Sequence, residues 1–507
     1  MSRNSLQNNS RLIVWLLIAA HTLIAVPLAY LLPIWSDEGS TLHTTERGVA
    51  WAVQNAATFE RQAPLYFWFL SLWREINGSI FFARLPSIIA SAAAILVFSR
   101  ICEQYLSRRS TLLATAFFAL HPILFWASTE IRVYAFVILI SVALMRLFLS
   151  GFFADAVETS RRDRVLFTLV ALIALYSNYY LGFVLVGLFL ALLVTCRWRC
   201  AWNYLLLMIV VGIAFLPMLT VLWRQFGVNA GSFTDERSFA VGARQIWGHV
   251  LDFILPADLS SGEPTVISVV RLWLVRMAVI VAAVLAVSRR RLLSRLTVGT
   301  CAVVATILGC LLLAYFELGR EFTLLRHATV LFVPLLLFLG SLLNDVGPSL
   351  RRDSLLVTTG LSILVGFFFS YAFITHYPNL AKPGDWARVG AFIQQNESAG
   401  EPIVVFHTYD AMTLPYEYRG VNEVLPNDHF LDFDLQTPTP ELIRSRTAFT
   451  TSLIPPNADK VWLLTNYECG SPGTCDQLEN YVWENYETVI DGSFYLQRVR
   501  LLRRKQH

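Results

Sequence analysis

Charged residues are scarce in this sequence. Lys, Arg, Asp and Glu make up only 15% of the 507 residues, whereas hydrophobic residues make up 55% and the mean hydropathy is +0.54. A soluble domain needs far fewer apolar residues than this, so the composition predicts an integral membrane protein. No segment is basic enough to suggest nucleic-acid binding. The net charge of +4 says little, because the placement of Lys and Arg carries the information in membrane proteins.

Cysteine is also infrequent, with seven residues in the chain. Cys196 and Cys200 have no convincing further ligands nearby, so we do not expect a zinc site there. Cys469 and Cys475 are separated by the turn-forming spacer Gly-Ser-Pro-Gly-Thr, which can bring their sulfurs into bridging range. This spacing predicts a disulfide in an oxidising compartment. The remaining cysteines are expected to be inert thiols.

Long apolar runs recur along the first three quarters of the chain. The first run, 12–34, is too long for a signal peptide, whose apolar core has about 7–15 residues, and about 20 apolar residues cross the bilayer. It therefore predicts a first membrane span. Ten further spans are expected at 80–99, 110–128, 133–152, 165–177, 181–196, 203–223, 265–288, 296–316, 328–346 and 353–375.

The arginines predict which way these about 11 helices run. Cytoplasmic loops are enriched in Lys and Arg, and every second loop here is basic. The basic loops carry Arg100, Arg108, Arg109, Arg161, Arg162, Arg164, Arg197, Arg199, Arg289, Arg290, Arg291, Arg295, Arg351 and Arg352. The pattern predicts a cytoplasmic N-terminus, and it places the first loop 35–79, the loop 224–264 and the C-terminus outside the cytoplasm.

The composition changes after residue 376. Pro, Asp, Asn and Glu become frequent, and the apolar runs 403–406 and 461–464 are typical of strands. We therefore expect a transmembrane domain over 1–375, followed by a small soluble α/β or α+β domain over 376–507 on the outer side.

Two carboxylates, Asp37 and Glu38, directly follow the first span. A carboxylate beside the hydrocarbon boundary loses solvation, which makes it a more effective base toward a substrate hydroxyl. The alternative is an acidic helix end with no chemical role. The next segment, 44–59, predicts an amphipathic helix in the membrane interface. Its expected lipid side carries Val49, Val53, Ala56 and Ala57, and its expected water side carries Arg47, Gln54 and Glu60.

Several short elements recur in one order and on one side of the membrane. They are Asp37-Glu38, Gln62-Ala63-Pro64-Leu65-Tyr66, Arg84-Leu85-Pro86-Ser87, Glu130-Ile131-Arg132-Val133-Tyr134, Ser177-Asn178-Tyr179-Tyr180, Arg326-His327 and Asp385-Trp386. Together they resemble the integral-membrane glycosyltransferases of the GT-C superfamily. The protein O-mannosyltransferases, the aminoarabinose transferases of lipid A and the Rgt-type transferases are the most similar families. Gln62-Ala63-Pro64 departs from the usual His-Pro-Pro, and Arg326-His327 departs from the usual Arg-Tyr.

The resemblance implies an enzyme that inverts the sugar configuration during transfer. The donor would be a sugar on a polyprenyl phosphate, and the acceptor a hydroxyl of a lipopolysaccharide, another envelope glycan, a lipid or a protein. The site would lie at the periplasmic face of a bacterial cytoplasmic membrane. Asp37 would be the base. Glu38 would orient the acceptor, bind a divalent metal ion or share the base role, and whether a metal takes part stays open.

The resemblance also implies which residues bind the donor phosphate or the substrate. These are Arg84, Glu130, Arg132, Tyr134, Asn178, Tyr180, Arg326 and His327. Arginine suits phosphate because its planar fork donates two hydrogen bonds at once. The alternative for the arginines is anchoring by snorkelling, for Glu130 pairing with an arginine, and for the tyrosines anchoring at the interface.

Two other functional classes fit a chain with many spans. A polytopic lipid or solute transporter would place binding groups near the bilayer midplane, often in repeated halves, but these spans contain few charges and no evident repeat. A non-catalytic assembly protein would use its outer domain for contacts and would not need Asp37. The order of the motifs favours the transferase.

Overall fold

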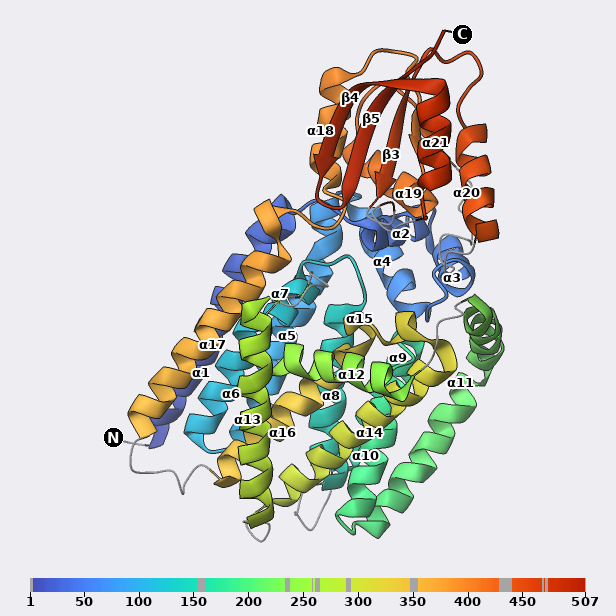
Figure 1. The fold of residues 1–507 in the computed structure, drawn as a ribbon. Coiled ribbons are helices and arrows are strands. Elements are labelled where there is room, and N and C mark those ends of the chain that lie inside the picture. The colour runs from blue at the N-terminus through green and yellow to red at the C-terminus, as the bar shows by residue number, and fades with distance from the viewer. Residues whose placement is uncertain are drawn as a thin grey trace. The chain divides into compact units, whose positions relative to one another are not determined.

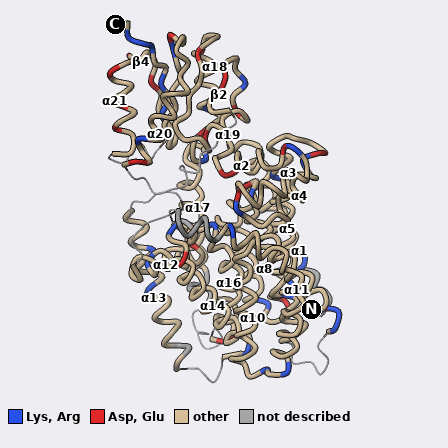
Figure 2. Tube along the Cα trace, turned by 90° about the vertical axis from the view of Figure 1, so that its right-hand side faces the viewer, with Lys and Arg blue, Asp and Glu red and all other residues tan. Residues whose placement is uncertain are grey.

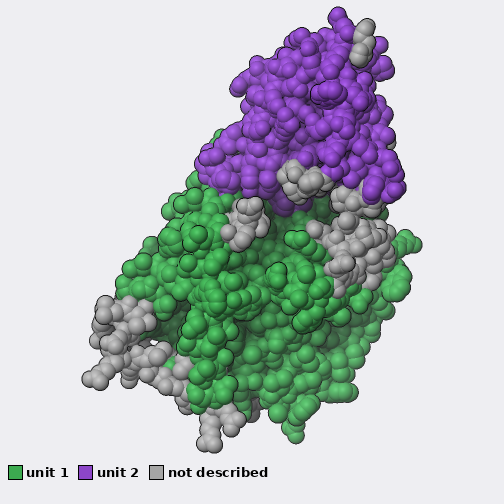
Figure 3. All heavy atoms as spheres, viewed as in Figure 1, with its two compact units in different colours: residues 1–30, 53–230, 235–376 green, residues 31–52, 231–234, 377–507 purple. Residues whose placement is uncertain are grey.

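The computed structural model describes residues 3–153, 160–232, 238–257, 259, 265–288, 293–346, 354–427, 440–466, 469 and 473–506. Its contacts divide the chain into two compact units, coloured in Figure 3. The first unit comprises residues 1–30, 53–230 and 235–376, and the second comprises 31–52, 231–234 and 377–507. Residues 31–52, which contain Asp37 and Glu38, thus belong to the same unit as the C-terminal domain.

The first unit is built from helices (Figure 1). They are α1 (Arg3–Leu31), α4 (Leu65–Ile76), α5 (Ile80–Tyr105), α6 (Arg108–Leu120), α7 (Pro122–Ser128), α8 (Tyr134–Phe148), α9 (Arg161–Ser177), α10 (Leu181–Val194), α11 (Trp198–Ser232), α12 (Phe239–Ile254), α13 (Val266–Ser288), α14 (Arg295–Leu318), α15 (Leu325–Ala328), α16 (Phe332–Val346) and α17 (Ser354–His376). A short π-helical turn, Leu149–Phe153, extends α8. Helix α3 (Val49–Thr58) crosses the boundary between the units.

Among the described residues, eight helices are long and apolar enough to span a membrane, so the chain is a multi-pass membrane protein. The pair α6 and α7 would make a ninth span, bent by 48°. The bend lies at His121-Pro122, because Pro122 lacks the backbone N–H that a continuous helix would need, and the His121 Nδ1 accepts from Ile123 N–H instead. Helices α9 and α10 coincide with the other two expected segments and are shorter, so eleven spans remains a prediction.

Charge is distributed along these helices as a lipid environment requires. Figure 2 shows long neutral stretches, with Lys and Arg gathered mainly near helix ends. Helix α13 leaves Val269, Trp273, Met277 and Ile280 exposed, which is costly in water and favourable in lipid. Several helices begin at a serine cap, as at Ser79, whose hydroxyl accepts from the Phe82 N–H at 3.3 Å.

Helix α12 differs from the long helices because it runs across them (Figure 1). It lies within the segment 224–264, which the sequence analysis treats as a loop. Two of its side chains bind the residue Thr323: the Gln245 amide donates to its carbonyl at 3.1 Å, and the His249 Nε2 lies 2.6 Å from the same oxygen. These contacts fix α12 beside the chain that leads into α15.

The second unit contains helix α2 (Ser36–Thr44) and a five-stranded sheet with the order β2-β1-β3-β5-β4. The strands are β1 (Ile403–Val405), β2 (Val424–Leu425), β3 (Lys460–Asn466), β4 (Tyr486–Phe494) and β5 (Gln497–Arg504). Strands β2, β1 and β3 are parallel, with Ile403 opposite Val424 and Trp462, whereas β5 runs antiparallel to both β3 and β4. The expectation of a small C-terminal domain that combines helices with a sheet, α/β or α+β, is therefore confirmed.

Successive side chains of each strand point to opposite faces of the sheet, so the apolar strand residues form two layers, one on each face. One layer joins Ile403, Val405, Trp462 and Leu464 to α18 (Trp386–Asn396) and α19 (Thr408–Glu417), as Figure 1 shows. The opposite layer joins residues such as Val404 to α21 (Asp476–Asn485), next to which α20 (Pro440–Ser452) packs. The sheet is thus covered on both faces.

The turn before α18 explains the sequence Pro383-Gly384-Asp385-Trp386. Gly384 has φ +99°, and a Cβ at this position would lie 2.3 Å from the Trp386 ring nitrogen. Only glycine combines this backbone conformation with so close an approach. The element therefore has a structural role at the start of the C-terminal domain.

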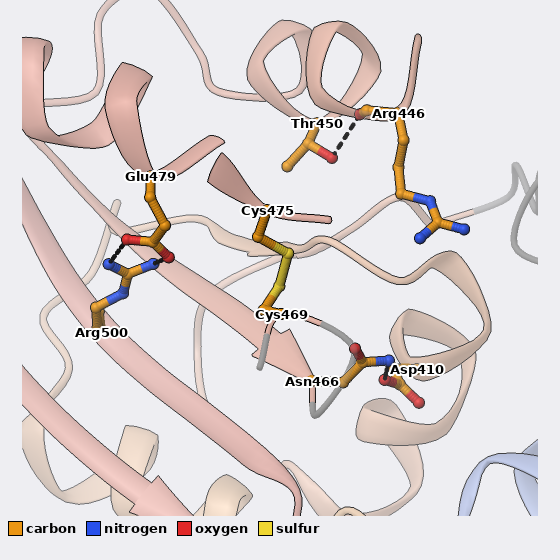
Figure 4. The surroundings of a disulfide bond; sticks show 8 residues. All are labelled: Asp410, Arg446, Thr450, Asn466, Cys469, Cys475, Glu479 and Arg500. Carbon is orange, nitrogen blue, oxygen red and sulfur yellow. Dashed lines mark hydrogen bonds and ion pairs between the residues drawn. A yellow bond between two sulfur atoms is a disulfide. The ribbon is translucent and has the colours of Figure 1, made fainter. Parts of the chain in front are cut away.

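Cys469 and Cys475 form a disulfide, as their spacing predicts (Figure 4). The same view shows the Arg500 guanidinium bound to the Glu479 carboxylate by two hydrogen bonds, of 2.7 and 2.6 Å. Both features stabilise the face of the sheet that α21 covers.

Candidate functional site

Asp37 and Glu38 lie in the first turn of α2. Helix α1 ends at Leu31, two residues before Pro33, and the extended residue Trp35 precedes Ser36, the first residue of α2. Carboxylates are favourable here because the helix N-terminus carries partial positive charge. The expected single amphipathic helix over 44–59 is wrong in its bounds, since α2 ends at Thr44 and α3 begins at Val49.

The two carboxylates have different surroundings. The Glu38 side chain is fully buried and accepts from the Lys382 Nζ at 2.8 Å, and the Lys382 side chain is 2% exposed. Asp37 is only half-buried. Burying a carboxylate costs free energy unless it is paired and hydrogen-bonded, and Lys382 supplies such a partner for Glu38.

A second contact holds the first residue of α2. The Ser36 hydroxyl donates to the Asp410 Oδ1 at 2.5 Å, and the Asp410 residue is 3% exposed. The other oxygen of Asp410 accepts from the Gln497 amide at 3.1 Å and from the Asn466 amide at 3.4 Å. Asn466 ends β3, Gln497 begins the antiparallel β5, and α19 follows β1, so these groups meet at one edge of the sheet.

Helix α2 packs closely against α19 in this unit. A Cβ added at Gly39 would lie 2.2 Å from the Thr413 Oγ1 and 3.0 Å from the Thr413 Cα. The Ile34 N–H, just before α2, donates to the Glu417 carboxylate at the other end of α19, at 3.2 Å. Glycine at 39 is therefore required for the observed approach of the two helices.

A further polar cluster lies beyond the C-terminus of α2. The Glu46 carboxylate accepts from the Tyr416 hydroxyl at 2.8 Å, and it lies 3.2 Å from His43 Nδ1 and 3.4 Å from Arg47 Nε. Burial alone would raise the pKa of Glu46. The hydrogen bonds from His43 and Tyr416 and the charges of His43 and Arg47 outweigh it and lower the pKa below its ordinary value.

Arg132 in the first unit is paired with a carboxylate that the sequence analysis places in water. The Arg132 Nη1 donates to the Glu60 Oε2 at 2.9 Å, and the two side chains are 7% and 4% exposed. The expectation that Glu60 faces water is therefore wrong, because the buried guanidinium needs a counter-charge. Ala56, expected toward lipid, is likewise buried inside the protein.

His327 is the centre of a basic cluster in the first unit. The charges of Arg326, Arg132 and His249 all act on its imidazole. The Tyr180 ring stacks on it with centroids 5.1 Å apart, and the Tyr180 hydroxyl donates to the Phe322 carbonyl at 2.5 Å. Four of the predicted site residues are thereby brought together. Arg132 and Tyr180 come from the turns before α8 and α10, and Arg326 and His327 come from α15.

The other predicted residues have contacts that hold the fold. Arg84 is fully buried, and its Nη1 donates to the Ala29 carbonyl of α1 at 2.8 Å. Glu130 is buried too, and its carbonyl accepts from the Ser87 hydroxyl at 2.7 Å.

Tyr134 stacks on Trp126, with ring centroids 4.6 Å apart. The Asn178 side chain accepts from the Tyr180 N–H at 3.0 Å, which orients the tyrosine.

Sequence reasoning missed Lys382, Asp410, His249 and the buried role of Glu60. Lys382 precedes the recognisable Pro-Gly-Asp-Trp element by one residue, and a lone lysine there gave no signal of a partner 344 residues earlier. Asp410 looks like an ordinary acid in the first turn of a helix. Within the described ranges no group of three or more His, Cys, Asp or Glu side chains is placed to hold a metal ion.

Part of the sequence matches a known family model. Residues 61–223 match the model described as dolichyl-phosphate-mannose-protein mannosyltransferase. This segment runs from the loop after α3 into α11, and it includes Arg132 and Tyr180. A search of curated proteins finds no match to the chain.

One solved structure shares the fold, and two others match it less well. ArnT from Cupriavidus metallidurans bound to undecaprenyl phosphate is similar with a TM-score of 0.54 and 16% identity, over 96% of this chain and 97% of ArnT. The apo structure of the same ArnT has a TM-score of 0.47 and 16% identity, again over 96% of this chain and 97% of ArnT. The Archaeoglobus fulgidus oligosaccharyltransferase in complex with Zn and sulfate has a TM-score of 0.45 and 12% identity, over 92% of this chain and 69% of the oligosaccharyltransferase chain.

The protein is therefore a multi-pass membrane protein with the GT-C fold. Within that fold it is similar to ArnT and, over residues 61–223, to the protein mannosyltransferases, which confirms the resemblance drawn from its motifs.

Proposed function

We propose that the protein is a membrane glycosyltransferase that moves a sugar from a polyprenyl-phosphate donor to an acceptor hydroxyl at the outer face of a bacterial cytoplasmic membrane. The observation that carries the proposal is the basic cluster around His327, found within a fold shared with ArnT bound to undecaprenyl phosphate. The acceptor would be a lipopolysaccharide, another envelope glycan, a lipid or a protein.

The basic cluster suits a lipid-linked phosphate. Arg132 and Arg326 both lie near His327, so they bring two guanidinium groups to the place where an incoming phosphate would bind. The His327 imidazole can donate a further hydrogen bond, and the Tyr180 ring stacks on it. Guanidinium groups stabilise a departing phosphate because they carry fixed charge and donate in a planar fork.

Asp37 is the proposed base. Glu38 is engaged by Lys382, which leaves Asp37 as the half-buried acid of the pair. In an inverting transfer the Asp37 carboxylate takes the acceptor's O–H proton as the oxygen attacks the anomeric carbon, and the polyprenyl phosphate leaves with the electron pair of the broken bond. A positioned general base contributes about 10²- to 10⁴-fold to such a step.

Two features support the outer face as the location. The basic loops alternate along the chain, which favours an outer location for the ends of α1, α7 and α9. The disulfide between Cys469 and Cys475 suits an oxidising compartment.

The test is sugar transfer by the purified full-length protein in lipid nanodiscs. The protein is given radiolabelled hexosyl and pentosyl polyprenyl phosphates with an extract of envelope glycans, lipids and proteins. We expect the label to move to an acceptor and free polyprenyl phosphate to appear in equal amount. Absence of transfer from every lipid-linked donor, together with movement of labelled lipid or solute across proteoliposomes, would identify a transporter instead.

A further inference from the structure

We propose that the C-terminal domain is part of the catalytic machinery, because it clamps helix α2 at two points and thereby aims Asp37. This inference rests on the proposed function. The clamp is defined as the two pairs Ser36–Asp410 and Glu38–Lys382. Asp410 and Lys382 are thus positioning residues that act through the neighbours of the base.

The two contacts flank Asp37 on both sides in the sequence. Successive residues of an α-helix are about 100° apart, so Ser36 and Glu38 point about 100° to either side of Asp37. Gly39 points about 160° away from Asp37 and faces Thr413 of α19. Gly39 thus meets the C-terminal domain opposite Asp37, while Ser36 and Glu38 hold the helix from either side of Asp37.

The clamp is built to resist rotation of the helix. Glu38 and Lys382 are 0% and 2% exposed, so breaking their pair would cost free energy by removing a close counter-charge from a buried group. Asp410 cannot turn freely either, because its second oxygen is held by Gln497 and Asn466 at the sheet edge. The close approach of Gly39 to Thr413 removes the space into which α2 could tilt.

The clamp also explains why two adjacent acids are present. Glu38 is a buried anchor that fixes the rotation of α2 about its axis. This rotation in turn fixes the direction in which the Asp37 side chain points. A misplacement of about 1 Å can cost about 100-fold in rate, so loss of the clamp is expected to lower kcat while the donor KM stays the same. The donor KM is expected to stay the same because the residues proposed to bind the donor phosphate belong to the first unit, whereas the clamp residues belong to the second.

The test uses four variants of the full-length protein. Ser36→Ala and Lys382→Met each remove one point of the clamp, and the exchange Glu38→Lys/Lys382→Glu restores a buried pair with reversed charges. Glu479→Gln is the matched control, because it breaks the pair with Arg500 on the face of the same sheet that α21 covers (Figure 4).

Hydrogen exchange of the backbone amides of residues 36–44 reports the clamp without any reaction. We expect faster exchange in Ser36→Ala and in Lys382→Met, recovery in the exchanged pair, and no change in Glu479→Gln. Unchanged exchange in both single variants would overturn the clamp, whatever the protein catalyses.

Sugar transfer reports the consequence for Asp37. We expect kcat to fall about 100-fold in Lys382→Met with an unchanged donor KM, at least tenfold recovery in the exchanged pair, and wild-type rates in Glu479→Gln. Faster exchange with undiminished kcat would overturn the positioning role. A wild-type protein that transfers nothing would overturn the proposed function and the positioning role together, while the exchange data would still decide the clamp.

Discussion

Asp37 and Glu38 are neighbours in the sequence, but their surroundings assign them different tasks. Glu38 is buried against Lys382, so its charge is already neutralised by a close partner. Asp37 is half-buried, and its side chain points about 100° away from that of Glu38 around α2. A general base must accept a proton from a substrate, and an acid locked into a buried ion pair cannot approach one. At the scale of single residues, Asp37 is therefore the base in our account.

The proposed phosphate site is tested by replacing Arg326. Lysine keeps a positive charge but loses the planar fork, so Arg326→Lys is expected to weaken binding of polyprenyl phosphate about tenfold, and Arg326→Gln about 100-fold. Equilibrium binding of the unglycosylated lipid phosphate to protein in nanodiscs measures both. Arg444→Lys, at an exposed arginine of the C-terminal domain, is the control and should bind normally. Equal affinities across all variants would remove Arg326 from the site.

The cluster around Glu46 predicts an acid-dependent stability. The pKa of Glu46 is lowered from its ordinary 4.5, so its stabilising contribution is complete above that pH and is lost as the pH falls through the lower folded value. Wild type should unfold at a higher temperature than Glu46→Gln near neutral pH. That difference should shrink toward zero between about pH 5 and about pH 3. A difference that stays constant over this range would show that Glu46 is not held as an anion by His43 and Tyr416.

At this scale the sequence predicts residue types better than partners. Motif order predicted that Arg132, Tyr180, Arg326 and His327 share a site, and the structure brings them together. It could not predict the Glu38–Lys382 pair, because the two residues are 344 positions apart and neither position has a distinctive pattern.

At the scale of elements, apolar periodicity located the helices well. Each of the eleven expected spans coincides with helix, including the two short segments α9 and α10. The error lies in the segment 44–59, where an amphipathic pattern suggested one surface helix. Tertiary contacts decided otherwise, since Ala56 and the Glu60 carboxylate are buried. A hydrophobic side predicts burial, but not whether lipid or protein provides it.

The contact between α2 and α19 gives a prediction at this scale. A methyl group at residue 39 would collide with Thr413, including its backbone, so Gly39→Ala should force α2 away from α19. We expect the transfer rate to fall about 100-fold through misplacement of Asp37. Gly309→Ala in α14 is the control, because nothing lies within 4 Å of the added Cβ. Wild-type transfer by Gly39→Ala would mean that the fit of these helices does not matter to the reaction.

At the scale of the whole molecule, the division of the chain differs from what composition suggests. The change of composition after residue 376 predicts that a soluble domain starts there, but residues 31–52 belong to the same compact unit as residues 377–507. Composition follows the chain and cannot reveal that a segment from the first loop packs with one more than 300 residues later. The candidate base thus belongs to the unit that contains the C-terminal domain.

Membrane orientation is tested by labelling cysteines in intact cells. The C-terminal disulfide should face outward, so an impermeant maleimide should label Cys469 and Cys475 only after reduction by an impermeant phosphine. Cys196, which is exposed and lies beside the basic residues Arg197 and Arg199, should be labelled only in permeabilised cells. The opposite pattern would place the candidate site in the cytoplasm, where it could not face the proposed donor.

The central claim is tested most directly by single-turnover sugar transfer with Asp37→Asn. Asparagine has nearly the same shape as aspartate but cannot take the acceptor's proton. The account predicts that the transfer rate falls about 10²- to 10⁴-fold, while the dissociation constant of the donor stays within about threefold of wild type. Transfer at the wild-type rate by Asp37→Asn, with donor bound normally, would contradict it.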